Sequence, residues 1–268
     1  MEGLWTRIAL RVWVVLVLLF LFIPIAIIPI FALNASKVQA WPPTSLTFSW
    51  INLTLSDPDV VSAIGLSVRV ALVTTAAALV LGSLAAFAIH RTNFFGKDAI
   101  SFLLVLPLAL PGIITAIALR SSFTFANIEL SIWTIIIGHT TFCIVVVYNN
   151  VLARLRRTQG SLFEAAADLG ASGFQTFRDI TVPLISTALV AGAMLAFALS
   201  FDEVIVTTFT AGAQNTVPIW ILAHLRSGQR LPEVNVVVSL VILVTIIPVV
   251  AAARLTGGSG AARVRAGR

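Results

Sequence analysis

The sequence predicts an all-α membrane protein with six transmembrane helices. Hydrophobic residues make up 59% of the 268 residues and charged residues 10%, and the mean hydropathy is +1.03. An average soluble domain has roughly a quarter of its residues charged, so this chain cannot cover a water-facing surface. The apolar residues form continuous runs of about 20, the length of a spanning helix, whereas a transmembrane barrel would show short alternating segments.

Six apolar runs are long enough to cross a membrane. We place them at residues 8–33, 60–90, 99–119, 132–152, 184–209 and 234–253. The first run is too long for a signal peptide and is followed by no A-x-A-like cleavage site. Pro107 and Pro111 are expected to kink the third span. After the fifth span, "TVPIWILAHLRSG" predicts a short interfacial helix that Thr216 caps and Gly228 ends.

The formal net charge of +6 is explained by membrane topology and not by nucleic-acid binding. If the N-terminus is cytosolic, the cytosolic segments hold 12 of the 17 basic residues, the outer segments hold 4, and Arg69 lies within a span. An excess of Lys and Arg in cytosolic loops is typical of membrane proteins. We therefore predict that both termini are cytosolic. The basic residues on the cytosolic side are Arg7, Arg11, Arg91, Lys97, Arg154, Arg156, Arg157, Arg178, Arg254, Arg263, Arg265 and Arg268.

The loop at residues 153–183 is the longest polar stretch, and it predicts two short helices. Ser161 with Glu164, and Ser172 with Gln175, have the spacing of capping boxes. The first helix, at residues 162–169, should end at Gly170 in a left-handed conformation. The second should end near residue 179, and Pro183 marks the return to the membrane.

The first of these helices carries a narrow apolar stripe. Its members at spacing i, i+3, i+4 and i+7 are Leu162, Ala165, Ala166 and Leu169. Small residues let a partner approach the backbone closely, and a helix this short is marginal in water without a partner. Glu164 and Asp168 should repel each other unless basic groups lie nearby. A plain connecting loop is the alternative, although loops of this length are unusual without a function.

The spacing of this loop is similar to a known family pattern. Glu164-Ala165-Ala166, three residues, Gly170, nine residues and then Ile180-Thr181-Val182-Pro183 resembles the EAA-x3-G-x9-I-x-L-P loop of permease subunits of binding-protein-dependent ABC importers. Only Val182 departs from it. The resemblance implies that Glu164, Ala165, Ala166, Leu169, Gly170 and Pro183 couple the permease to an ATPase.

The same resemblance implies a bacterial cytoplasmic membrane protein with a single permease domain over residues 1–268. The expected partners are membrane lipid, a second permease, two ATP-binding subunits and an extracytoplasmic solute-binding protein. This chain has no G-x4-G-K-[ST] phosphate loop, so ATP and Mg²⁺ are expected on the partner ATPase. We predict no metal site in the chain, because His139 and His224 lack carboxylate or cysteine partners at ligand spacing. We also predict no catalytic residue and no cofactor in the chain.

Three ionisable residues within predicted spans are candidates for the translocation path: Arg69, Asp202 and Glu203. On a continuous fifth helix, one acid would neutralise Arg69 and the other would face a cavity. A structural role for both acids is the alternative. The segments "SFDEVIVTTFTAG" and "LPEVNVVVSLVIL" resemble the second permease of spermidine/putrescine-type importers, which implies a polyamine. Arg69 could instead hold an anion.

Two other function classes are alternatives to the importer permease. An ion-coupled secondary transporter would be favoured by inverted repeats or by broken helices in matching halves, and the sequence shows neither. A membrane enzyme would use Asp202, Glu203 and a histidine, but no hydrolytic motif such as G-x-S-x-G is present.

Overall fold

The computed structural model describes residues 3–92 and 95–246. Within these residues the chain is helical, with one isolated β-bridge between Asn34 and Leu46 and no named strand. The C-terminal part of the predicted sixth span, residues 247–253, lies outside the described residues, as do Arg254, Arg263, Arg265 and Arg268. The chain divides into two compact units, residues 1–61 with 221–268, and residues 62–220.

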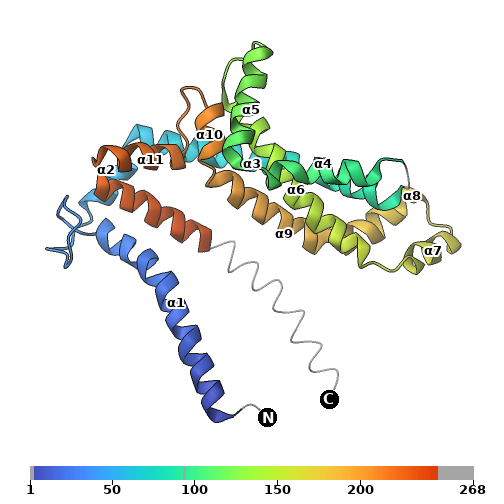
Figure 1. Cartoon of the computed structure of the whole chain (residues 1–268), viewed down its shortest axis with the longest axis horizontal. Helices are drawn as coiled ribbons and strands as arrows, with labels where there is room; N and C mark the ends of the chain where they lie inside the picture. The colour runs from blue at the N-terminus through green and yellow to red at the C-terminus, as the bar shows by residue number, and fades with distance from the viewer. Residues whose placement is uncertain (1–2, 93–94, 247–268) are drawn as a thin grey trace. The chain divides into compact units, whose positions relative to one another are not determined.

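The first unit contains α1 (Leu4–Ala32), α2 (Ser49–Leu55) and the apolar helix Leu231–Ile246 (Figure 1). The helix α2 was not predicted, because its sequence lies in a Pro- and Ser-rich segment. It is fixed by the Trp50 side chain, whose Nε1 donates to the carbonyl oxygen of Asn34 at 2.9 Å. In addition, Thr54 Oγ1 donates to the Trp50 carbonyl at 2.7 Å.

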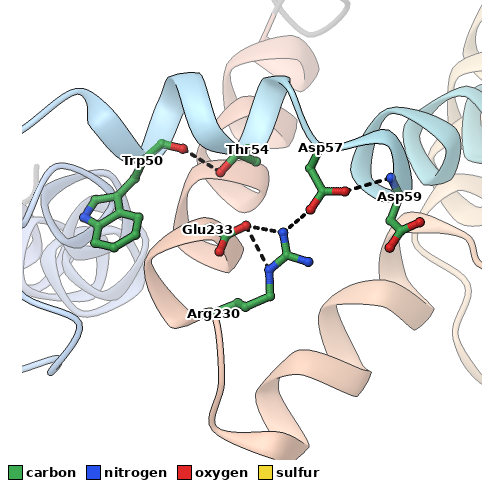
Figure 2. Close-up of polar contacts among 6 residues, drawn as sticks. All are labelled: Trp50, Thr54, Asp57, Asp59, Arg230 and Glu233. Atoms are coloured by element: carbon green, nitrogen blue, oxygen red, sulfur yellow. Dashed lines mark hydrogen bonds and ion pairs between the residues drawn. The ribbon is translucent and has the colours of Figure 1, made fainter.

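A cluster of three charged side chains joins two distant parts of the first unit. Arg230 donates through its guanidinium group to both Asp57 and Glu233, as Figure 2 shows. Glu233 is 5% exposed, so its carboxylate depends on Arg230 for compensation of its charge. The hydrogen bond from Arg230 lowers the pKa of Asp57 below its usual value of 3.8. The cluster therefore ties the segment before α3 to the start of the helix Leu231–Ile246.

We expect Arg230→Gln to lower the free energy of unfolding by about 3–5 kcal/mol, because it leaves the buried Glu233 carboxylate without its cation. Because the pKa of Asp57 is lower in the folded protein than in the unfolded chain, its carboxylate stabilises the folded state at pH values above the unfolded pKa. This contribution is lost as the pH falls through the folded pKa. The difference in thermal midpoint between the wild type and Arg230→Gln should therefore shrink below about pH 4. Arg226→Gln, which changes an exposed arginine four residues away, is the matched control. An equal loss in both variants would contradict the prediction.

The second unit is built around one buried helix, α6 (Ile132–Arg156). It packs against α4 (Lys97–Ala109), α5 (Gly112–Phe125), α9 (Val182–Phe201) and α10 (Ile205–Thr210), and α9 runs along its length (Figure 1). The other elements are α3 (Pro58–Arg91), α7 (Ser161–Asp168), α8 (Gly173–Gln175), a π-helix at Thr176–Thr181 and α11 (Val217–Ser227). The boundaries between the two units fall within α3 and α11.

Two glycines let neighbouring helices approach α6 closely. A Cβ atom at Gly82 of α3 would lie 2.8 Å from the Ile144 carbonyl oxygen and 2.9 Å from Val147 Cβ. On α9, a Cβ atom at Gly192 would lie 3.4 Å from Val147 Cα. Close backbone approach at small residues is a common way for membrane helices to associate. Val147 is fully buried between these two contacts.

The prediction of an all-α membrane fold is confirmed, but the count of six spans is not. Among the described residues, four helical segments are long and apolar enough to cross a membrane, or five if the bent pair α4 and α5 counts as one span. The four are Leu4–Ala32, Pro58–Arg91, Ile132–Arg156 and Gly173–Phe201. The helix Leu231–Ile246 is shorter within the described residues. The predicted third span is broken into α4 and α5, which are bent by 104°. Pro111 explains the break, because a proline disfavours the helical conformation in the residue before it, and Leu110 is extended.

The predicted interfacial helix is present as α11, and Gly228 follows it with a φ of +65°. The predicted cap by Thr216 is wrong. Thr216 Oγ1 is buried without a hydrogen-bond partner, and the first backbone N–H of α11, that of Val217, donates instead to Ser67 Oγ at 2.8 Å. A side chain 150 residues away therefore replaces the local cap.

Candidate functional site

The loop between α6 and α9 contains the two helical turns that the sequence predicts, but the first one starts differently. Gly160 is the N-cap of α7 and has helical φ and ψ, and no side-chain hydrogen bond caps the helix. The predicted capping box of Ser161 with Glu164 is therefore wrong. Ser161 is already within the helix, where its hydroxyl cannot reach the amide of the residue three positions ahead.

Gly170 ends α7 as predicted. It has a φ of +77°, its N–H donates to the Ala167 carbonyl at 2.9 Å, and the N–H of Ala171 donates to the Ala166 carbonyl at 3.0 Å. These two bonds are the Schellman pattern, in which a left-handed residue satisfies the last carbonyls of a helix. No atom lies within 4 Å of a Cβ built at Gly170, so only the backbone conformation requires glycine here.

Because there is free space around it, substitutions of Gly170 should be ranked by backbone strain alone. We expect Gly170→Asn to be the mildest, Gly170→Ala to destabilise the loop by about 1–2 kcal/mol, and Gly170→Val to be worst. The measurement is solute-stimulated ATP hydrolysis by the assembled complex. Gly173→Ala, at a glycine with an ordinary φ and equally open space, is the control. Equal tolerance of all the Gly170 variants would contradict the ranking.

The second capping box is confirmed. Ser172 N donates to Gln175 Oε1 at 2.7 Å, and Gln175 N donates to Ser172 Oγ at 3.3 Å. The helix does not end near residue 179, however. It continues through the π-helix at Thr176–Thr181 into α9, where Pro183 lies in the first turn. Proline lacks an N–H and clashes with the carbonyl four residues earlier, and the wider π-turn accommodates it.

The predicted apolar stripe of α7 is divided between two environments. Leu169 is 88% exposed and Leu162 is 46% exposed, and Ala165 is exposed as well. Ala166 is only 6% exposed, so its methyl group is covered by this chain and not by a partner. The members of the stripe that remain exposed are Leu162, Ala165 and Leu169, which we call the α7 outer face.

Aromatic contacts hold the loop against α3. The Arg91 guanidinium carbon lies 5.9 Å from the ring centroid of Phe163 in α7. The rings of Phe87 and Phe177 are 5.8 Å apart in an edge-to-face arrangement. Both geometries are attractive. The loop is therefore attached to α3 at two points, and its position depends on the end of α3 that carries Phe87 and Arg91.

The two acids of α7 form no ion pair with the other described residues. Glu164 and Asp168 are exposed, and no ion pair in the described part of the chain involves either of them. Arg154, a basic residue at the end of α6, donates from Nε to the Leu184 carbonyl at 2.8 Å and so joins α6 to α9. The two carboxylates remain available to a basic partner surface.

The path candidates lie at a break in the predicted fifth span. The helix α9 ends at Phe201, Asp202 is its C-cap, and α10 begins at Ile205. Glu203 Oε1 accepts the N–H of Val206 at 2.9 Å, so this acid caps the start of α10. Asp202 is exposed. The expectation of one continuous fifth helix that carries both acids is therefore wrong.

The predicted pairing of Arg69 with an acid is not formed. Arg69 is exposed on α3, and among the described residues no ion pair joins it to Asp202 or Glu203. Glu203 accepts a hydrogen bond from the backbone N–H of Val206, three residues later in the sequence, and not from Arg69 on another helix. Arg69 and Asp202 both remain available to a solute.

His139 is a central residue that sequence reasoning did not select. It is fully buried, with Nδ1 2.9 Å from Ser200 Oγ and Nε2 2.8 Å from Thr207 Oγ1. These hydroxyls stand on the two sides of the break between α9 and α10. No spacing in the sequence could indicate this, because the partners are 61 and 68 residues away.

Comparison with known proteins identifies the family. The sequence model of the family described as "Binding-protein-dependent transport system inner membrane component" matches residues 78–257. The chain belongs to this family. The match includes the whole of the α7 loop and the break at Asp202. This chain is therefore a permease subunit of an ABC importer.

Its relatives support the same conclusion over more of the chain. The permease is 33% identical to the spermidine/putrescine transport system permease protein PotC of Escherichia coli K12, over 87% of this chain and 88% of the relative. It is 33% identical to the putrescine transport system permease protein PotI of the same organism, over 86% of this chain and 85% of the relative. In Haemophilus influenzae, a PotC protein is 30% identical, over 88% and 92%.

Among solved structures, the permease resembles a chain of a bacterial ABC transporter that imports the acidic polysaccharide alginate. The TM-score is 0.69 with 18% identity, over 96% of this chain and 98% of the other. A chain of a bacterial alginate ABC transporter in complex with a periplasmic protein bound to an alginate pentasaccharide gives a TM-score of 0.69 with 15% identity. This match covers 95% of this chain and 97% of the other. At this identity the likeness concerns the fold.

Proposed function

We propose that this permease forms the membrane path for a small cationic solute of the polyamine class. The observation that carries the proposal is the 33% identity to PotC and PotI over most of both chains. The site agrees with it, because Asp202 presents an exposed carboxylate with no ion pair among the described residues. A carboxylate on the path attracts a cation and repels an anion.

The proposed assembly contains a second, different permease, two ATP-binding subunits and an extracytoplasmic solute-binding protein. The permease itself is proposed as a single domain over residues 1–268, with both termini in the cytosol of a bacterium. ATP and Mg²⁺ bind to the partner ATPase. The α7 outer face, exposed in the isolated chain, docks on that ATPase, and the uncompensated Glu164 and Asp168 favour a basic rim on its surface.

An anionic solute is the second candidate. Arg69 is exposed on α3 and forms no ion pair within the described residues. Guanidinium groups bind carboxylates and phosphates well. A solute panel should therefore contain both charge types.

The test is solute-stimulated ATP hydrolysis by the complete complex in proteoliposomes. Putrescine, spermidine, an oligosaccharide of uronic acids and a neutral sugar would be compared, each delivered with the solute-binding protein. Stimulation by the two polyamines alone supports the proposal, and stimulation by the anionic sugar alone would replace it with the second candidate. Uptake driven by an ion gradient in the absence of ATP would overturn the importer mechanism as well.

A further inference from the structure

His139 contacts both ends of a short loop. We define this loop as residues 201–206, which are the last residue of α9, the three non-helical residues 202–204 and the first two residues of α10. Ser200 and Thr207 flank it, and both are buried, at 3% and 0% exposure. The hydroxyl of each lies within 2.9 Å of one ring nitrogen of His139. A neutral imidazole offers one donor and one acceptor, so both of its polar atoms are used.

Neighbouring contacts show how the chain runs past His139. Near one end of α6, Thr134 Oγ1 donates to the Thr210 carbonyl at 2.7 Å, and one turn beyond His139, Cys143 Sγ contacts the Ala196 carbonyl at 3.4 Å. The helices α9 and α10 therefore both run antiparallel to α6. Seven residues of a continuous helix advance by roughly 10 Å. Ser200 and Thr207 nevertheless contact the same imidazole ring, and the helix is interrupted between them.

The inner side of this loop is tightly held. Thr207 Oγ1 donates to the Glu203 carbonyl at 2.7 Å, and Glu203 Oε1 accepts the N–H of Val206 at 2.9 Å. A Cβ atom at Gly138, next to His139, would lie 2.9 Å from Val206 Cγ1. The backbone at Gly138 thus packs directly on the start of α10. Asp202 lies in the same loop and is exposed.

We propose that His139 is a positioning residue for transport, which closes the loop at residues 201–206 and so holds the Asp202 carboxylate in place on the path. The proposal rests on the proposed role of Asp202. An imidazole suits this task because its two nitrogens are fixed relative to each other by the ring. Asparagine keeps a polar atom near the position of Nδ1 only, and glutamine near that of Nε2 only.

The first experiment measures the loop directly, without reference to transport. Spin labels on Leu195→Cys and Thr208→Cys, two exposed positions on either side of the loop, report the distance between α9 and α10 in the assembled complex. We expect a narrow distance distribution in the parent protein, a broad one with His139→Leu, and intermediate ones with His139→Asn, His139→Gln, Ser200→Ala and Thr207→Val. The last four also serve if His139→Leu fails to assemble.

Cys143→Ala is the matched control for this measurement. Cys143 is fully buried on the same helix and also contacts α9, but its contact does not cross the loop. We expect the Cys143→Ala distribution to stay as narrow as the parent one. A distribution unchanged in the His139 variants, or broadened equally by Cys143→Ala, would overturn the proposal.

The second experiment connects the loop to transport. In the complete complex we expect His139→Leu to raise the spermidine concentration for half-maximal uptake about tenfold, with little change in the unstimulated ATPase rate. Combined with Asp202→Asn, it should add no further loss, because the carboxylate it positions is already gone. If the distance distribution is broad in His139→Leu but uptake is normal in Asp202→Asn, the proposed path is refuted and the loop closure by His139 stands. Reduced uptake in Asp202→Asn with unchanged distances in His139→Leu would refute the positioning role alone.

Discussion

Replacing Ala165 with arginine should separate this permease from its ATP-binding subunit and abolish most solute-stimulated ATP hydrolysis. Ala165 lies on the α7 outer face between Leu162 and Leu169, and Leu169 is 88% exposed in the isolated chain. Overpacking a close-fitting site costs about 1–3 kcal/mol, which corresponds to a roughly 5- to 150-fold loss of affinity. Burying the arginine charge without a partner adds to this cost.

Ala167→Arg is the matched control, because Ala167 is exposed on the same helix but lies about 200° around it from Ala165. It should retain co-purified ATPase. Ala166→Arg should behave differently from both, since Ala166 is 6% exposed within the chain, and should disturb the loop itself. The measurement is the amount of ATPase that co-purifies, together with stimulated hydrolysis. If Ala165→Arg retains as much ATPase as Ala167→Arg, the docking face is assigned wrongly.

Asp202→Asn should raise the polyamine concentration needed for half-maximal uptake, with the complex assembled normally. The substitution keeps the size and removes the charge. A hydrogen bond to a charged group contributes about 1–2 kcal/mol more than a neutral one, so the expected increase is roughly 5- to 30-fold. Asp202 is exposed and forms no ion pair among the described residues, so the folded protein should tolerate the change.

Glu203→Gln serves as the control for charge at the same place. Its side-chain oxygen can still accept the N–H of Val206, the contact made by Glu203 Oε1 at 2.9 Å. Uptake should therefore change less than in Asp202→Asn. Arg69→Leu should not rescue either variant, because Arg69 pairs with neither acid. Normal polyamine uptake in Asp202→Asn would remove the main physical argument for a cationic solute, while the family assignment would stand on the sequence match.

Local features of the α7 loop were predictable because they depend on neighbouring residues. A left-handed residue is needed where α7 ends, and Gly170 supplies it with a φ of +77°. The Ser172 and Gln175 capping box closes over three residues. The same reasoning failed at Ser161, because the backbone is already helical at Gly160 and Ser161 is therefore not at the N-cap position.

By itself, then, the sequence determined that this is an all-α membrane protein whose longest polar loop contains two helical turns, since hydropathy and capping spacings are properties of adjacent residues. Only the tertiary structure decided the environment of each polar group. In the folded chain Ala166 is buried, the helix ends after Phe201, and Glu203 accepts a hydrogen bond from the N–H of Val206 and forms no ion pair with Arg69. The tertiary structure also brought His139 to Ser200 and Thr207. Buried polar atoms must find partners wherever packing places them, and packing joins residues that no sequence spacing connects.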